Sequence, residues 1–125
     1  NTFINSPKVL NADYSLKENS NLMFAGQITG VEGYVESAGS GLMCAIYLYN
    51  KLMGKKVNLI SENTTLGSLA KYITTENKDF QPMNANFGVL PTLNRIIRDK
   101  AERKKAMAER SLESVLEFKK EMDVW

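Results

Sequence analysis

The chain has 125 residues, 43% of them hydrophobic and 24% charged, with a formal net charge of +2 at pH 7. These values are typical of one modest globular domain or of a piece of a larger one, and the charge is too small to indicate nucleic-acid binding by itself. The single cysteine excludes an intrachain disulfide framework, and the absence of histidine removes the most common general base and zinc ligand. Because no apolar run approaches the roughly 20 residues that span a bilayer, we expect a cytoplasmic protein without membrane contact.

Residues 1–30 are predicted to form loop and short strand. Turn-forming residues dominate as far as Asn21, and the apolar run Leu22–Ala25 predicts a buried strand. The chain opens at Asn1 without a methionine, from which we expect a fragment or a processed piece.

A glycine-rich turn with Gly26, Gly30 and Gly33 follows the apolar run. Glycine permits positive φ and close approach of another group, and a helix N-terminus presents free N–H groups and partial positive charge. This pattern is typical of a site for a phosphate or an electron-rich ring. A tight turn that needs glycine for packing alone explains it equally well. No G-x-G-x-x-G follows a strand, so the sequence lacks a complete dinucleotide-binding unit.

A helix is predicted over residues 31–54. Thr29 and Glu32 fit a capping box, although the glycines also allow a start at Tyr34. Apolar residues recur at intervals of three and four and predict one buried face. They are Val35, Ala38, Leu42, Ala45, Ile46, Tyr49, Leu52 and Met53.

Two further helices are predicted, over residues 65–74 and 92–122. Thr64 or Thr65 is expected to cap the first, and the apolar stretch between the two helices is expected to pack onto the rest of the chain. The sequence therefore predicts a mainly α fold in one unit, residues 1–125, with about three helices and one or two short strands. The last helix carries a narrow apolar stripe of Leu93, Ile97, Ala101, Ala108, Leu112, Val115 and Met122.

Candidate chemical groups outside the glycine-rich turn are few. Cys44 lies in an apolar helix without a histidine to activate it, which favours an inert thiol over a nucleophile. Glu32 and Glu36 favour a cap and a solvated charge over acid–base catalysis. Between Thr92 and Lys105, six basic residues face two acidic ones, so this segment is either an RNA-binding surface or a solvated helix. The candidate RNA-binding residues are Arg95, Arg98, Arg103, Lys104 and Lys105.

Three ordered segments carry a resemblance to a known family. Ala25-Gly-Gln-Ile-Thr-Gly-Val-Glu-Gly-Tyr-Val-Glu-Ser-Ala38 resembles the signature of the folate- and FAD-dependent tRNA (uracil-5-)-methyltransferases, which are glucose-inhibited-division-protein-like flavoproteins. Asn1-Thr-Phe-Ile-Asn-Ser-Pro7 resembles the family segment before it. Phe80-Gln-Pro-Met-Asn-Ala-Asn-Phe-Gly88 with Ile97-Arg-Asp-Lys100 resembles the C-terminal part, and Thr65–Ile73 fits between them.

The resemblance implies an enzyme that forms 5-methyluridine in the T loop of tRNA, using methylenetetrahydrofolate, FAD and NAD(P)H. It implies that this chain is the C-terminal portion of an α/β FAD-binding domain, with the helix at 31–54 facing the flavin. The catalytic residues would lie outside this chain, and no metal is implied. The cofactor-binding residues would be Gly26, Gln27, Gly30, Glu32, Gly33 and Tyr34.

The isolated chain is then expected to be inactive, to bind little FAD and to self-associate through apolar surface that the rest of its FAD domain would cover. Its partner in the parent enzyme would be tRNA. Three alternatives remain open at this point: a related flavoprotein that modifies wobble uridines, a member acting on ribosomal RNA, and a non-catalytic helical module for RNA binding or assembly.

Overall fold

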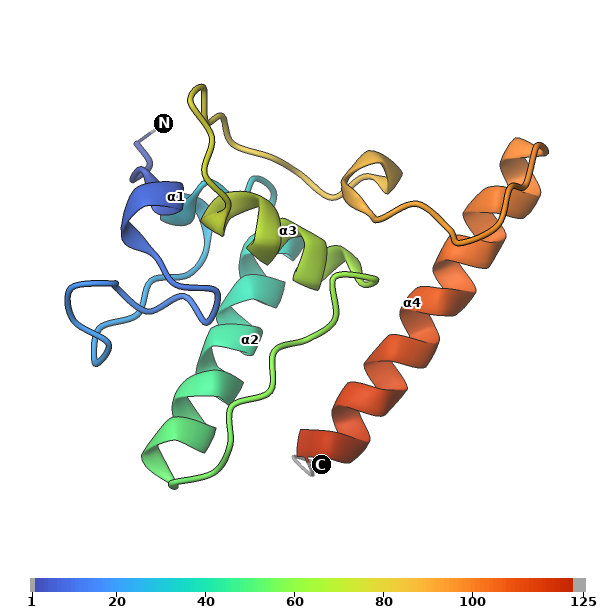
Figure 1. Ribbon diagram of the computed structural model, residues 1–125. Helices are drawn as coiled ribbons and strands as arrows, with labels where there is room; N and C mark the ends of the chain where they lie inside the picture. Colours follow the sequence, from blue (N-terminus) through green and yellow to red (C-terminus); the bar gives the residue numbers. More distant parts are fainter. Residues whose placement is uncertain (1, 123–125) are drawn as a thin grey trace.

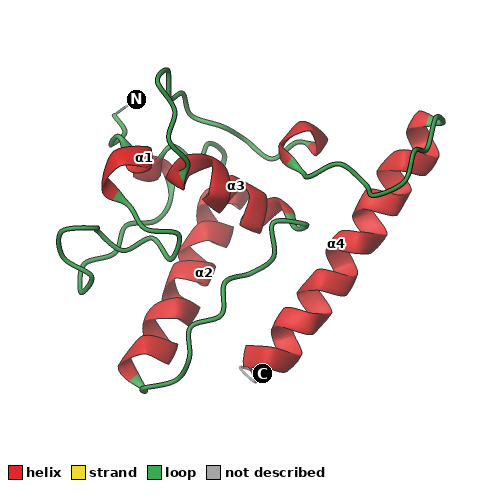
Figure 2. Cartoon of the chain, viewed as in Figure 1, coloured by secondary structure: helices red, strands yellow, loops and turns green. Residues whose placement is uncertain are grey.

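The structure is a computed structural model and describes residues 2–122. Its helices are α1 (Ser6–Val9), α2 (Tyr34–Leu52), α3 (Thr65–Thr74) and α4 (Lys100–Met122), with short 3-10 turns at Gln27–Thr29 and Phe87–Val89. Helices and loops make up the fold, as Figure 2 shows. The predicted mainly α class is therefore confirmed.

Strand pairing in the described residues is limited to isolated bridges, which join Leu10 to Leu16, Ser15 to Met23, and Val31 to Met83. The predicted buried strand at Leu22–Ala25 was wrong, because only Met23 pairs, and it pairs with a nearby loop rather than with a sheet. Leu22 is also 46% exposed.

The helix predicted over residues 31–54 begins at Tyr34, which was the alternative start. Gly33 has φ 111° and ψ 152°, a conformation outside the helical region, and its carbonyl accepts the Ser37 N–H at 2.9 Å. The capping box does not form, because the Thr29 hydroxyl donates to the Gly26 carbonyl at 2.7 Å inside the 3-10 turn.

The buried face of α2 is also different from the predicted one. Its buried residues are Ser40, Met43, Ile46, Tyr47 and Asn50, so only Ile46 belongs to both sets. Most of the predicted stripe points outward: Val35 is 83% exposed and Leu52 is 75% exposed. Because α2 is apolar on two sides, its sequence pattern cannot tell which side this chain covers.

The core lies where α2 meets α3 and the N-terminal segment, residues 2–25 (Figure 1). It also takes in Phe118 and Met122 near the end of α4. A methyl group on Gly39 would lie 2.5 Å from Leu66 Cδ2, so glycine lets α2 and α3 pack closely. The remaining core members are Tyr14, Val31, Met43, Ile46, Tyr47, Ile60, Leu69, Ala70 and Ile73.

Helix α3 spans the range expected from the sequence. Of the two candidate caps, Thr64 is the one used: its hydroxyl accepts the Gly67 N–H at 3.0 Å. This bond satisfies one of the free N–H groups at the helix start.

Helix α4 begins at Lys100, so the predicted start at Thr92 was eight residues too early. The Asp99 side chain accepts the Glu102 N–H at 2.9 Å and its carbonyl accepts the Arg103 N–H at 3.0 Å, which fixes the first turn. Arg110 holds the preceding loop to the helix by donating to the carbonyls of Pro91 (2.6 Å) and Thr92 (3.1 Å).

The predicted apolar stripe of α4 is only partly correct. The buried residues are Met107, Phe118 and Met122, whereas Leu112 is 65% exposed. Within residues 2–122, no helix is long and apolar enough to cross a membrane.

Candidate functional site

Residues 26–33, called here the glycine loop, lead into α2. Gly26, Gly30 and Gly33 have φ values of 84°, 95° and 111°, a region that side chains with a Cβ rarely adopt. The three glycines therefore give the loop its path.

The N-terminal segment and α2 hold one side of the glycine loop. The Ile4 N–H donates to the Ile28 carbonyl at 2.8 Å, and the buried Ser6 hydroxyl donates to the Thr29 carbonyl at 2.6 Å. The Gly26 N–H donates to the Ser40 hydroxyl at 2.9 Å. These bonds place the loop directly before the start of α2.

The segment around Met83 holds the other side. The Met83 N–H donates to the Gly30 carbonyl at 2.9 Å, and the Glu32 N–H donates to the Met83 carbonyl at 2.9 Å. Phe80 fills the space that a Cβ on Gly30 would need, 2.4 Å from Cζ. The apolar stretch after α3 thus packs onto the chain as predicted.

Gly33 is constrained in the same way. A Cβ there would lie 2.1 Å from Glu36 Oε2, and the other oxygen of this carboxylate accepts the Ala85 N–H at 3.1 Å. The absence of a Cβ at Gly30 and Gly33 therefore leaves room for the side chains of Phe80 and Glu36. Glu36 has a structural role, and Glu32 is exposed.

The start of α2 is nevertheless open. The N–H groups of Tyr34 and Val35 have no hydrogen-bond acceptor within residues 2–122, as is general for the first turn of a helix. The Tyr34 side chain is 98% exposed. The six predicted cofactor-binding residues lie between Gly26 and Tyr34, in the stretch that leads into this helix start.

An electron-rich ring edge or a phosphate fits these donors and the Glu36 N–H, which also has no acceptor within residues 2–122, because the helix dipole favours negative charge there. The Glu36 carboxylate lies beside the same helix end and offsets part of that preference. The described residues would donate hydrogen bonds to such a ligand only from the side of the α2 start.

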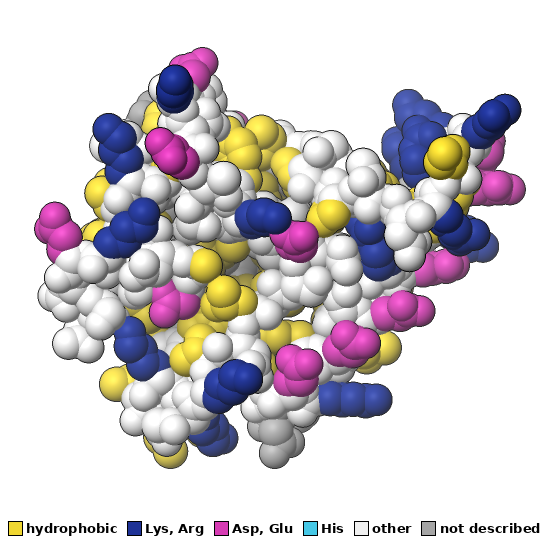
Figure 3. Space-filling model, viewed as in Figure 1, with side chains coloured by type: hydrophobic (Ala, Val, Ile, Leu, Met, Phe, Trp, Pro, Cys, Tyr) yellow, Lys and Arg dark blue, Asp and Glu magenta, His cyan; other side chains and the backbone are white. Residues whose placement is uncertain are grey.

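The basic residues predicted to contact RNA lie near the start of α4, where Figure 3 shows a gathering of Lys and Arg side chains at the upper right. Two of the five have contacts within the chain. Arg103 donates to the Ile97 carbonyl at 3.2 Å, and the Lys104 ammonium lies 5.4 Å from the centroid of the Phe87 ring. Arg95, Arg98 and Lys105 are exposed.

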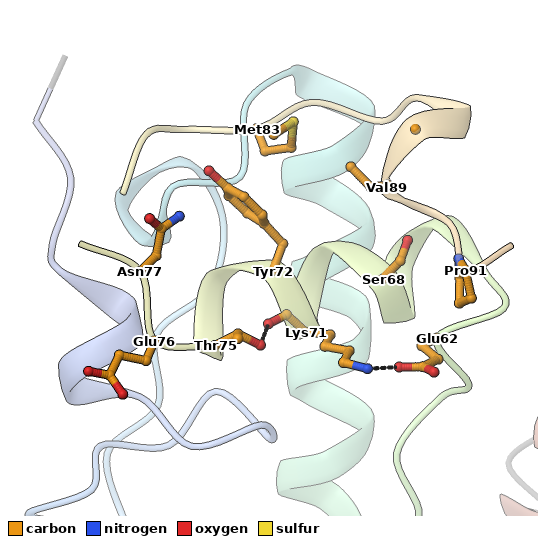
Figure 4. Close-up of a pocket in the computed structure, with 11 residues that line it drawn as sticks. Glu62, Ser68, Lys71, Tyr72, Thr75, Glu76, Asn77, Met83, Val89 and Pro91 are labelled. Atoms are coloured by element: carbon orange, nitrogen blue, oxygen red, sulfur yellow. Dashed lines mark hydrogen bonds and ion pairs between the residues drawn. The ribbon is translucent and has the colours of Figure 1, made fainter. Parts of the chain in front are cut away.

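A separate groove of about 520 Å³ lies between α3 and the stretch from Met83 to Pro91 (Figure 4). Lys71 and Glu62 form an ion pair at its edge, and the Tyr72 hydroxyl donates to the Gln81 carbonyl at 2.7 Å. None of the predicted cofactor-binding residues lines it. Sequence reasoning missed this groove, because its walls come from α3 and from a stretch that joins them only in the folded chain.

Cys44 is half-buried, and burial raises the pKa of its thiol, with a smaller contribution from Asp13. A raised pKa lowers the thiolate fraction at neutral pH, which supports the prediction of an inert thiol.

Comparisons with known proteins connect this geometry to a family. A family model described as "Glucose inhibited division protein A" matches residues 1–56, which include the glycine loop and all of α2. Proteins from Staphylococcus aureus strains JH9, Newman and N315 are each 55% identical to this chain over 122 residues, which is 96% of the chain and 28% of the relative. They are named "Methylenetetrahydrofolate--tRNA-(uracil-5-)-methyltransferase TrmFO".

This chain is therefore similar over 96% of its length to part of these methyltransferases. The resemblance carried by the residues around the glycine loop is thereby confirmed. The chain spans 28% of the length of the relatives it matches. The high identity extends beyond the part that the family model covers, so α3 and most of α4 belong to the shared sequence as well.

Proposed function

We propose that this chain is the C-terminal part of a cytoplasmic enzyme that forms 5-methyluridine in the T loop of tRNA. Methylenetetrahydrofolate would supply the one-carbon unit, and FAD with NAD(P)H would supply the electrons. The names of the relatives support the substrates, and the single structural observation that carries the proposal is the open start of α2 next to the glycine loop.

In this proposal the chain forms one wall of the FAD site. Gly26, Gly30 and Gly33 set the path of the loop, and the N–H groups of Tyr34 and Val35 donate to the ring edge and stabilise negative charge on it. Gln27, Glu32 and Tyr34 belong to the same stretch, and the exposed, flat phenol ring of Tyr34 suits stacking. When bound, FAD supplies the redox chemistry, and this chain contributes no catalytic residue.

The rest of the FAD domain would cover the outward apolar face of α2. Leu42 and Leu52 are 53% and 75% exposed on this face, with Val35 and Tyr49 beside them. Contiguous apolar surface of this kind usually marks an interface. The isolated chain is accordingly proposed to self-associate through α2.

Replacing both Leu42 and Leu52 by glutamate is expected to abolish that self-association. Burying two carboxylates in an apolar interface costs several kcal/mol in total. Sedimentation of the chain should give a mass above 14.0 kDa that falls to the monomer value in the double variant. Ile96→Glu is the control, because Ile96 is as exposed but lies on the loop before α4. A monomeric parent chain would contradict the proposal.

The exposed basic residues near the start of α4 are proposed to contact tRNA phosphates. Changing Arg95, Arg98 and Lys105 together to glutamine is expected to weaken tRNA binding and to reduce the salt dependence of log K by about 2 to 3, since each lost phosphate contact contributes roughly 0.7–0.9. Lys119 and Lys120, at the other end of α4, provide the control. An unchanged salt dependence would show that these residues form a solvated surface.

The reaction itself is tested with the longer polypeptide that contains this chain. Incubation with tRNA, methylenetetrahydrofolate and NAD(P)H is expected to yield 5-methyluridine in the T loop. Product at the wobble position or only in ribosomal RNA would support one of the related activities instead. Tight tRNA binding by the chain, together with a longer polypeptide that contains no flavin, would favour a non-catalytic RNA-binding module.

A further inference from the structure

A second groove, of about 650 Å³, lies between the N-terminal segment and the turn after α3. Three lysines from separate segments line it: Lys8 at the end of α1, Lys17 in the following loop, and Lys78 in the turn after α3. We call it the lysine groove. The fold alone brings these residues together, since they are far apart in the sequence.

The lysine groove carries uncompensated positive charge. None of its lysines forms an ion pair with another residue of the described chain, and Glu76 is the one carboxylate among its lining residues there. The Lys17 ammonium donates to the Pro7 carbonyl at 3.3 Å, which orients this charge without neutralising it. Asn5 and Asn77 add neutral amides. Ammonium and amide donors together suit an anion with several carboxylate or phosphate oxygens.

The lysine groove adjoins the glycine loop. Ile4 and Ser6 form the hydrogen bonds to Ile28 and Thr29 described above, and Asn5 and Pro7, which alternate with them, line the groove. The same short segment therefore contacts the glycine loop and borders the lysine groove.

We propose that the lysine groove binds the glutamate tail of the folate substrate. This inference rests on the proposed function, which places methylenetetrahydrofolate next to the flavin. A folate has a flat ring system at one end and a glutamate at the other, and elongated forms carry one additional carboxylate for each γ-linked glutamate. The ring belongs at the flavin wall, and the anionic tail matches the three lysines. A concave site of this volume is in the range of small-molecule sites, whereas the exposed basic residues near α4 offer a surface for RNA.

The test compares the monoglutamate and pentaglutamate forms of methylenetetrahydrofolate in the longer polypeptide. Lys8→Gln with Lys78→Gln is expected to raise KM for the pentaglutamate about three- to tenfold, because two solvent-exposed ion pairs are lost. The KM for the monoglutamate should rise less, because it brings fewer carboxylates to the groove, and kcat should stay unchanged. The control is Lys55→Gln with Lys56→Gln, two exposed lysines after α2 that do not line the groove.

The outcomes separate this inference from the proposed function. Activity with equal KM for both folates in the parent enzyme overturns the tail site and leaves the methyltransferase proposal intact. A rise in KM for tRNA alone would assign the groove to RNA phosphates and also overturn it. If no methylation occurs, equilibrium dialysis of folate pentaglutamate against the same variants gives the comparison without turnover. If the parent and the Lys8→Gln, Lys78→Gln variant retain equal amounts of the pentaglutamate, the proposed site for the glutamate tail is overturned in this measurement too.

Discussion

Gly67→Ala is expected to destabilise the chain by about 3 kcal/mol, the upper part of the usual range for overpacking a core. A Cβ at this position would lie 2.0 Å from the Ser61 carbonyl oxygen and 2.9 Å from that of Ile60. Both are backbone atoms, so no side chain can rotate away. Gly67 is also the residue whose N–H binds the Thr64 cap, so relief of the clash would open the first turn of α3.

Gly41→Ala is the matched control, because it makes the same change inside another helix. A Cβ on Gly41 would meet no atom within 4 Å. The higher helix propensity of alanine should then stabilise the chain by about 0.5–1 kcal/mol. Urea unfolding followed by circular dichroism measures both variants. The account of the α3 cap fails if Gly67→Ala unfolds at the same urea concentration as the parent.

Gly33→Val is expected to remove most of the flavin from the longer polypeptide. Gly33 has φ 111°, and a valine there would collide with the Glu36 carboxylate, which binds the Ala85 N–H. If flavin binding requires this backbone conformation, strain of about 1–3 kcal/mol corresponds to an affinity about 5- to 150-fold lower. The start of α2, with its free N–H groups, would shift at the same time.

Visible flavin absorbance per mole of purified protein measures this effect. Lys56→Gln in the same polypeptide should keep the flavin content of the parent, since Lys56 is exposed and lies after α2, outside the glycine loop. A yellow Gly33→Val protein with normal flavin content would remove the glycine loop from the site.

The features that the sequence predicts well are those set by local chemistry. The cap at Thr64 and the bounds of α3 depend on residues within one helical turn. The glycine loop is recognisable because only glycine readily adopts its φ values. The family signature lies on the same residues.

Features that depend on distant partners were predicted poorly. The buried side of α2 is selected by α3 and the N-terminal segment, and both sides of this helix are apolar. The bridge between Val31 and Met83 joins residues far apart in the sequence, so it leaves no local pattern.

The late start of α4 depends on the Asp99 cap, which competes with a periodic pattern that continues back to Leu93. The lysine groove leaves no pattern in the sequence, because its lysines come from α1, the loop after it and the turn after α3.

The central claim is that this chain forms one wall of a flavin site that the rest of the polypeptide completes. Equilibrium dialysis of FAD against the chain alone, the remaining part of the polypeptide alone, and an equimolar mixture of the two tests it most directly. Either part alone should bind FAD weakly, and the mixture should bind it markedly more tightly. Stoichiometric FAD binding by this chain alone, or equal binding by the remaining part with and without it, would contradict the account.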